Sequence, residues 1–202
     1  MIMTKSKMLN YCKWQGLAML TFVLVYGSCN YYASLQAHRY SLYFDWELNI
    51  PHIPWMMIFY RTLDVILIIV LFLLSKKNMK QYGKAMIFSI LIAAPIFIIF
   101  PTQLGFERLQ NFENFETLYK ILYALDHPHN LFPSMHVCYA SLGIWAIIRE
   151  YPKYIIWHLV LWTWLILICA SIILVHQHHL LDIPGGLILA WLSFKIFFPK
   201  ET

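Results

Sequence analysis

Charged residues are scarce in this chain. Of its 202 residues, 12% are charged and 60% are hydrophobic, whereas a soluble globular domain has about a quarter charged residues and about half apolar ones. Glycine is also rare, with 7 residues, while 17% are aromatic, which excludes a low-complexity or disordered chain. No internal repeat appears at periods of about 20 to 50 residues. The composition predicts a membrane protein with one polytopic domain over residues 1–202.

Paired cysteines are missing as well. Cys12, Cys29, Cys138 and Cys169 stand singly in apolar stretches, without the close spacing of a zinc site or a disulfide framework. We expect buried free thiols, because unpaired cysteine is among the most buried residue types. The formal charge of +5 does not indicate nucleic acid, since the placement of Lys and Arg carries the information in a membrane protein. No nucleic-acid partner is expected.

Long hydrophobic runs are what the chain does have. A helix needs about 20 predominantly apolar residues to cross a bilayer. Such runs lie near residues 13–33, 54–75, 85–103, 133–149, 154–175 and 183–198. They predict an all-α fold with six transmembrane helices. The first run follows several lysines, like a signal peptide, but the Tyr-Tyr pair after it suits a membrane interface, so we favour an uncleaved span.

The basic residues separate by side in a six-span arrangement. One side receives most of them, and the loops of the other side hold Arg39, Arg108 and Lys120. Because cytoplasmic loops are rich in Lys and Arg, both termini are predicted to be cytoplasmic. The outer loops are then 34–53, 104–132 and 176–182. These loops and the adjoining helix ends carry eight of the nine histidines, namely His38, His52, His127, His129, His136, His176, His178 and His179.

The third outer loop leads into the last run as SIILVHQHHLLDIPGG, residues 171–186. His178 and Asp182 are four residues apart, so on a helix they would share a face, and the carboxylate could hold one imidazole nitrogen. This arrangement is typical of a nucleophile or base with its orienting partner. A solvated histidine-rich turn is one alternative. Another is metal binding by His176, His178 and His179, because imidazole suits zinc or copper.

A second group opens the fourth run as NLFPSMH. Pro133 suits the first turn of a helix, and the Ser134 hydroxyl with the free amides of a helix N-terminus forms an anion site. His136 adds an imidazole that could protonate a group attached to a bound phosphate. A plain helix cap with an interfacial histidine is the alternative. The predicted topology places this segment on the same side as His178 and Asp182.

Together these motifs resemble the type-2 phosphatidic acid phosphatase superfamily. That family shows P-S-x-H and then S-R-x5-H-x3-D, and the segment PSMH with Ser171, His178 and Asp182 keeps its spacing. The resemblance implies six spans with an outward-facing site. It also implies a membrane lipid phosphate as the substrate and no metal or other cofactor.

The resemblance implies roles for single residues. His178 would attack phosphorus and become a phosphohistidine, with Asp182 fixing its tautomer. His136 would protonate the leaving lipid oxygen and then activate water. Ser134 and the amides beside it would bind phosphate oxygens, with Met135 in the place of the motif's glycine.

Two basic positions of the family are missing. Its K-x6-R-P motif is absent, with Gln103 near the expected arginine, and Ile172 stands where the third motif has its arginine. Phosphoryl transfer depends on such charges, so another cation is expected. Arg61 is one candidate, because it lies in the second span with Asp64 three residues on. Arg108, at the start of the long outer loop, is the other.

The chain without the third-motif arginine also resembles the branch of inositol phosphorylceramide and sphingomyelin synthases. We therefore expect a membrane phosphatase that removes phosphate from a lipid phosphate on the outer leaflet. The enzyme alternative is a lipid phosphotransferase that passes the group to a lipid alcohol. A His-rich transporter or metal-handling protein and a catalytically silent lipid-binding relative stay open. Single-sided loops and short tails favour a bacterial inner membrane, with the site facing the periplasm.

Overall fold

The computed structural model describes residues 4–108, 115–125 and 127–199, which we call the described residues. They form helices and no strand, and their β pairing is a single bridge between Tyr40 and Thr102. In chain order the helices are α1 (Lys5–Ser34), the 3-10 helices η1 (Asp45–Asn49) and η2 (Pro54–Met56), α2 (Met57–Leu73), α3 (Lys76–Ile99), α4 (Glu116–Leu125), α5 (Met135–Glu150), α6 (Ile155–Leu174) and α7 (Asp182–Phe197). The all-α prediction is confirmed.

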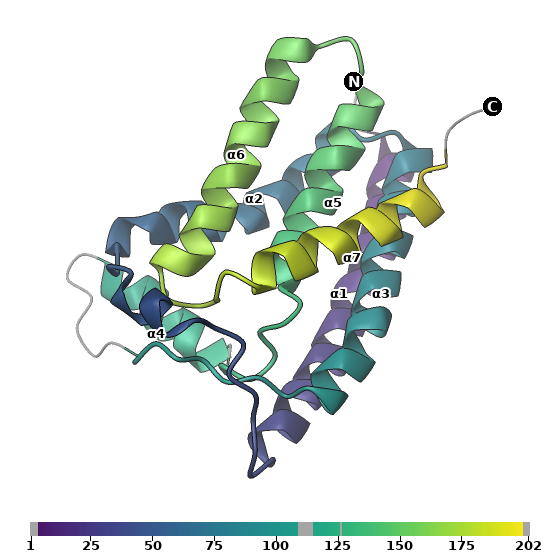
Figure 1. Ribbon diagram of the computed structural model, residues 1–202. Coiled ribbons are helices and arrows are strands. Elements are labelled where there is room, and N and C mark those ends of the chain that lie inside the picture. The colour runs from purple at the N-terminus through teal and green to yellow at the C-terminus, as the bar shows by residue number, and fades with distance from the viewer. Residues whose placement is uncertain (1–3, 109–114, 126, 200–202) are drawn as a thin grey trace.

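Helix α5 lies at the centre of the bundle (Figure 1). It packs against α2, α3, α6 and α7, while α1 runs along α3. Most of its side chains are buried, including polar Ser141 as well as apolar residues such as Leu142 and Ile144. A central helix is a rigid support, so a group at its N-terminus is held in a fixed place.

Among the described residues, three helical segments are long and apolar enough to cross a membrane by themselves, namely Pro54–Leu73, Lys76–Ile99 and Ile155–Leu174. Helices also occupy the other three predicted runs. However, α5 and α7 have 16 residues each, fewer than the roughly 20 that a perpendicular span needs. Helix α1 is long but buries polar side chains, including Lys7, Gln15 and Asn30. Length and apolarity therefore support three of the six spans.

Helix α3 begins nine residues before the predicted run. Ser75 caps it, because its Oγ accepts the Asn78 N–H at 3.3 Å. The Glu150 carboxylate at the end of α5 accepts the Ser75 N–H and hydroxyl, both at 2.9 Å. The first turns of α3 are polar, so the apolar pattern of the sequence does not indicate them. The cap and its partner make them helical.

Helix α4 was not predicted, and it lies within the expected 104–132 connection. It is amphipathic: Tyr119 and Leu122 are buried, while Lys120 and Glu116 form an exposed ion pair at 2.6 Å. With 10 residues it is too short to span, so a search for transmembrane runs does not detect it.

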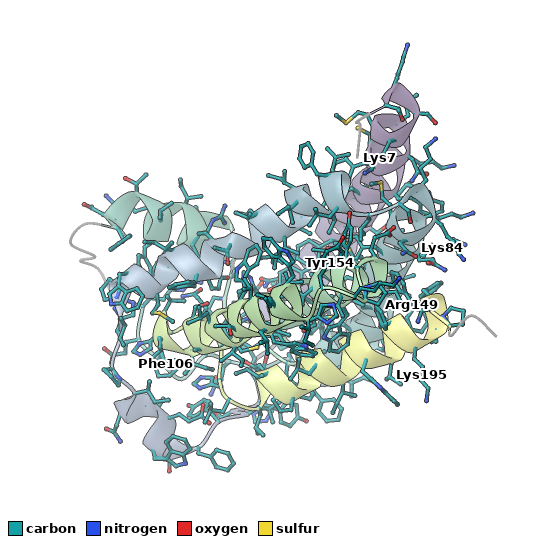
Figure 2. The ribbon with its side chains drawn as sticks, turned by 90° about the horizontal axis from the view of Figure 1, so that it is seen from above. Lys7, Lys84, Phe106, Arg149, Tyr154 and Lys195 are labelled. Carbon is teal, nitrogen blue, oxygen red and sulfur yellow. The ribbon has the colours of Figure 1, made fainter. Side chains whose placement is uncertain are left out.

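The two ends of the bundle differ in charge. The start of α1 and the end of α7 lie toward the same end (Figure 1). Figure 2 shows Lys84, Arg149 and Lys195 toward that end, with Phe106 at the opposite one. The labelled basic side chains therefore agree with the gathering of Lys and Arg at one end that the sequence suggested.

Candidate active site

The N-termini of α5 and α7 meet. Ser134 is the N-cap of α5, and its N–H donates to the carbonyl of Asp182 at 3.2 Å. The helices approach this closely because residue 186 is glycine: a Cβ at Gly186 would lie 2.5 Å from the Ser134 carbonyl oxygen. The two motifs are thus joined through the main chain.

A tight turn ends α6 and carries the second motif. The Gln177 N–H donates to the Ile172 carbonyl at 3.0 Å, and the His176 N–H donates to the Ile173 carbonyl at 2.9 Å, the hydrogen-bond pattern of a Schellman turn. His176 has a left-handed backbone, with φ 55°, which is uncommon outside glycine and asparagine. Its Nε2 donates to the Ile50 carbonyl at 2.9 Å. This turn directs His178 back toward α5.

His178 and Asp182 are in contact and nearly inaccessible, with 6% and 1% of their surface exposed. His178 Nδ1 lies 3.0 Å from Asp182 Oδ2. A carboxylate accepts hydrogen bonds, so Nδ1 carries the proton and Nε2 presents a lone pair. The contact crosses the turn rather than one helix face, since α7 begins only at Asp182.

Ser134 faces that lone pair. Its Oγ lies 3.4 Å from His178 Nε2 and accepts the Val137 N–H at 3.3 Å. The first amides of a helix have no partner within the helix and favour an anion. His178 Nε2 therefore points toward a helix N-terminus suited to phosphate.

His136 is held one residue into α5. Its Nε2 donates to the Tyr60 carbonyl at 2.7 Å, and its ring stacks on the Tyr60 ring with centroids 4.1 Å apart. Because Nε2 is engaged in this bond, Nδ1 is the nitrogen left for proton exchange.

His136 and His178 line one cavity of about 240 Å³. Arg61 and Asp64 of α2 line it too, with Arg61 Nη2 and Asp64 Oδ2 2.5 Å apart. Apolar side chains of α1 and α2 form part of its wall, among them Met19, Phe22, Leu63 and Leu67, and residues of α4, of α5 and of the segment before α5 also line it. A larger cavity of about 390 Å³ lies among side chains of α2, α5 and α6, and none of the predicted site residues lines it.

The other predicted site residues lie in different places. Met135 lines the cavity, and Pro133 is buried beside Ser134. Ser171 Oγ donates to the Ile168 carbonyl of its own helix at 2.7 Å. The Arg108 guanidinium lies 4.3 Å from the centre of the Tyr123 ring, and its Nη1 donates to the carbonyl of that tyrosine at 3.2 Å. Of the two candidate cations, Arg61 is the one at the cavity.

Three residues near the site had no role in the sequence predictions. Tyr60 supports His136, and Asn130 lines the cavity while its amide donates to the Tyr26 carbonyl at 3.1 Å. Glu47 of η1 is fully buried against the turn before α7. One indication of Glu47 was present in the sequence: the chain has only 10 acidic residues. A glutamate is rarely buried unless it is paired, so each of these acids was a candidate for a specific contact.

The three histidines of the turn have separate partners. His176 contacts the Ile50 carbonyl, His178 contacts Asp182, and His179 contacts Glu47. Among the described residues, no group of three or more His, Cys, Asp or Glu side chains is placed to hold a metal ion.

Comparison with known families agrees with the motifs. The sequence profile described as PAP2 superfamily matches residues 34–196. The chain belongs to the PAP2 superfamily. Searches of curated proteins and of solved structures found no match. Membership of the PAP2 superfamily supports an activity of the phosphatase or phosphotransferase type, and together with the apolar helices it supports an integral membrane protein.

Proposed function

We propose that this PAP2 protein is an integral membrane phosphatase that removes phosphate from a lipid phosphate through a phosphohistidine. One observation carries the proposal. His178 Nδ1 is fixed by Asp182 at 3.0 Å, so its Nε2 faces Ser134 at the N-terminus of α5. That is the geometry of an oriented nucleophile beside an anion site.

The first step forms the phosphoenzyme. The Nε2 lone pair of His178 attacks phosphorus, and the bond from phosphorus to the lipid oxygen breaks. Protonated His136 gives its Nδ1 proton to that oxygen, so the lipid leaves as an alcohol. Asp182 stabilises the positive charge that develops on the attacking imidazole.

The second step returns the enzyme to its starting state. Neutral His136 takes a proton from water as the water oxygen attacks phosphorus, and the bond from phosphorus to His178 breaks. Phosphate leaves, and His136 is again protonated. Over both steps, a lipid phosphate and water become a lipid alcohol and phosphate.

Arg61 supplies the positive charge in this proposal. It lines the cavity together with both histidines, whereas Arg108 lies over Tyr123. When phosphate enters, the Arg61 guanidinium gives up part of its ion pair with Asp64. It then donates two N–H groups to phosphate oxygens. This replaces the arginines that the family has and this chain lacks.

The surrounding membrane fits the same proposal. Six spans would place both termini in the cytoplasm and the cavity toward the outer leaflet, in a bacterial inner membrane with a periplasmic site. The basic side chains at one end of the bundle support this orientation (Figure 2). The apolar wall from α1 and α2 suits the chains of a lipid substrate.

The decisive experiment is a panel of lipid phosphates offered to the purified protein, with phosphate release and lipid products both measured. The His178→Ala variant should release no phosphate and trap no radiolabelled phosphoryl group. Ordinary turnover by this variant would refute the proposed mechanism. A parallel reaction with a strong chelator tests the metal-handling alternative, which predicts loss of activity.

A lipid phosphotransferase is the second candidate. The apolar cavity wall favours it as well, because a lipid alcohol could occupy the position of the attacking water. Phosphate release without an added acceptor identifies the hydrolase. A product that forms only with a lipid alcohol identifies the transferase.

A further inference from the structure

Glu47 is a buried carboxylate that lies outside the cavity. Its Oε1 accepts the Phe44 N–H at 3.0 Å, while its Oε2 accepts the Leu180 N–H at 2.9 Å and the His179 Nδ1–H at 3.3 Å. The residue is 0% exposed. A carboxylate is costly to bury unless donors satisfy it, so these three N–H groups fix its position. Glu47 thereby ties η1 to the turn between α6 and α7.

His179 is locked in one tautomer. The Gly105 N–H donates to its Nε2 at 2.9 Å, so the ring proton resides on Nδ1 and points at Glu47. Burial lowers the pKa of His179 below its ordinary value, against the opposing effects of Asp182 and Glu47. The ring is therefore neutral and has both nitrogens engaged.

Stacked rings also hold the same imidazole. The His179 ring stacks on Tyr43 and on Phe106, with centroids 4.4 Å and 4.7 Å away. The Phe106 ring also stacks on His176 at 3.9 Å, and Figure 2 shows Phe106 at the end of the bundle away from Lys84, Arg149 and Lys195. Two outer segments, one carrying Tyr43 and Glu47 and the other Gly105 and Phe106, thus close over the turn.

Glu47 and His179, which we call the covered pair, reach the proposed catalytic residues through one oxygen. The His179 N–H donates to Asp182 Oδ2 at 2.9 Å, and the same oxygen faces His178 Nδ1 at 3.0 Å. Any shift of the His179 backbone therefore moves the atom that orients His178. Neither member of the covered pair lines the cavity.

We propose that Glu47 and His179 are positioning residues for the phosphoryl-transfer reaction. They hold residues 179 and 180 so that Asp182 keeps His178 Nε2 directed at the N-terminus of α5, where phosphate is proposed to bind. They do not touch substrate themselves. The inference rests on the proposed function, because it needs His178 as the nucleophile. The sequence separation of 132 residues between Glu47 and His179 means that a distant segment, in addition to the local hydrogen bonds at the end of α6, holds this turn.

Two substitutions of His179 give a matched test. In His179→Asn the amide nitrogen stands near the place of Nδ1 and can still donate to Glu47, but the contact to Gly105 is lost. In His179→Gln the amide oxygen stands near the place of Nε2 and can still accept from Gly105, but the contact to Glu47 is lost. Each variant keeps one hydrogen bond and loses one, and both lose the imidazole ring.

The expected result is a difference in turnover. His179→Gln should lower kcat by on the order of 10- to 100-fold with KM nearly unchanged, the effect of misplacing a reacting group by about 1 Å. His179→Asn should recover most of the wild-type kcat. Glu47→Gln should behave like His179→Gln, since a neutral amide cannot accept from all three N–H donors. Phosphohistidine formation in a single turnover should fall with kcat.

Two outcomes would overturn the inference. One is wild-type kcat in both His179→Gln and Glu47→Gln. The other is an equal loss in His179→Asn and His179→Gln that follows a fall in the thermal midpoint, which is the pattern of a purely structural contact. His178→Ala distinguishes failure of the positioning role from failure of the proposed function. If His178→Ala is inactive while His179→Gln is normal, only the positioning role fails. If His178→Ala is active, the proposed function fails.

Discussion

Two carboxylate–histidine pairs lie next to each other in the turn between α6 and α7, and they differ at one nitrogen. In the pair of His178 and Asp182, Nε2 is directed at Ser134 beside the cavity. In the covered pair of Glu47 and His179, Nε2 is occupied by the Gly105 N–H. In the proposed mechanism the same residue types provide a reactive nitrogen in one pair and a rigid support in the other, and the pairs differ in whether a backbone amide occupies the second nitrogen.

The largest expected losses of activity come from substitutions of His178 and Asp182. His178→Ala should abolish turnover and phosphoenzyme formation, because it removes the proposed nucleophile. Asp182→Asn should lose on the order of 10⁴-fold in kcat, as expected when the orienting carboxylate no longer enforces the tautomer. Single-turnover trapping with a radiolabelled substrate measures both. Turnover of the asparagine variant near the wild-type level would remove the distinction between the two pairs.

His136→Ala should have a smaller effect that depends on the substrate. We expect a loss of about 10²- to 10⁴-fold with a lipid alkoxide leaving group, which needs a proton. With a good leaving group such as a nitrophenolate, phosphoenzyme formation should be largely retained and its hydrolysis slowed. A burst of leaving group followed by a slow steady state is the observation to seek. Equal losses with both substrates would contradict the role of general acid.

Substitutions of Arg61 and Arg108 compare a cation at the cavity with a cation away from it. Arg61→Ala should lower kcat/KM by on the order of 10²- to 10³-fold, the usual cost of removing one group that stabilises transition-state charge. Arg108→Ala should lower it far less, because its guanidinium lies over Tyr123. Arg61→Lys is the matched control, since it keeps the charge and loses the two-pronged contact. The reverse ranking would assign the clamp to the outer loop.

Gly186→Ala should weaken the junction of α5 and α7. The added methyl group would meet the Ser134 carbonyl at 2.5 Å and Val137 Cβ at 3.0 Å, so the helices must separate. Overpacking of this kind costs about 1 to 3 kcal/mol of stability. We expect a lower thermal midpoint and reduced turnover from the fraction that remains folded. Gly27→Ala is the control, because a Cβ there would meet nothing within 4 Å.

The smallest expected effect concerns pH and the covered pair. Burial lowers the pKa of His179 in the folded protein, whereas an unfolded histidine takes a proton near pH 6.5, roughly. The unfolded state therefore binds more protons below that pH, and stability falls as the pH decreases toward the folded-state pKa, by at most about 1.4 kcal/mol per pH unit. The loss is complete once the pH lies below the folded-state pKa.

Comparison with His179→Asn isolates this contribution. His52, His129 and His176 act in the same direction, and burial lowers the pKa of His52 to about 4. These three titrate in both proteins, so they cancel in the difference. Thermal midpoints measured from pH 7.5 to 5 should fall more steeply in the wild type. Parallel curves would show that His179 does not titrate differently on folding.

Local patterns explain how much could be predicted from the sequence. The runs of apolar residues located all six helices that the prediction placed, and the four-residue spacing correctly suggested the contact between His178 and Asp182. Helix α4 was not predicted, because its apolar face is short and alternates with charged residues. The start of α3 escaped because Glu150, distant in sequence, supports its cap.

Partners that are distant in sequence were beyond that reasoning. Nothing around Glu47 indicates that its carboxylate meets the N–H of Leu180, 133 residues away. The choice between Arg61 and Arg108 likewise needed the packing of α2 beside α5, which places only Arg61 at the cavity. Helix packing and long-range hydrogen bonds, rather than local propensity, decide such contacts.

The main-chain bond from the Ser134 N–H to the Asp182 carbonyl has a practical consequence for engineering. Since no side chain takes part, this bond does not itself depend on the side chains at positions 134 and 136, although Ser134 also caps α5. The frame and the reactive groups can therefore be varied separately. A new nucleophile, acid or anion ligand placed at those two positions would inherit a geometry that the backbone has already set.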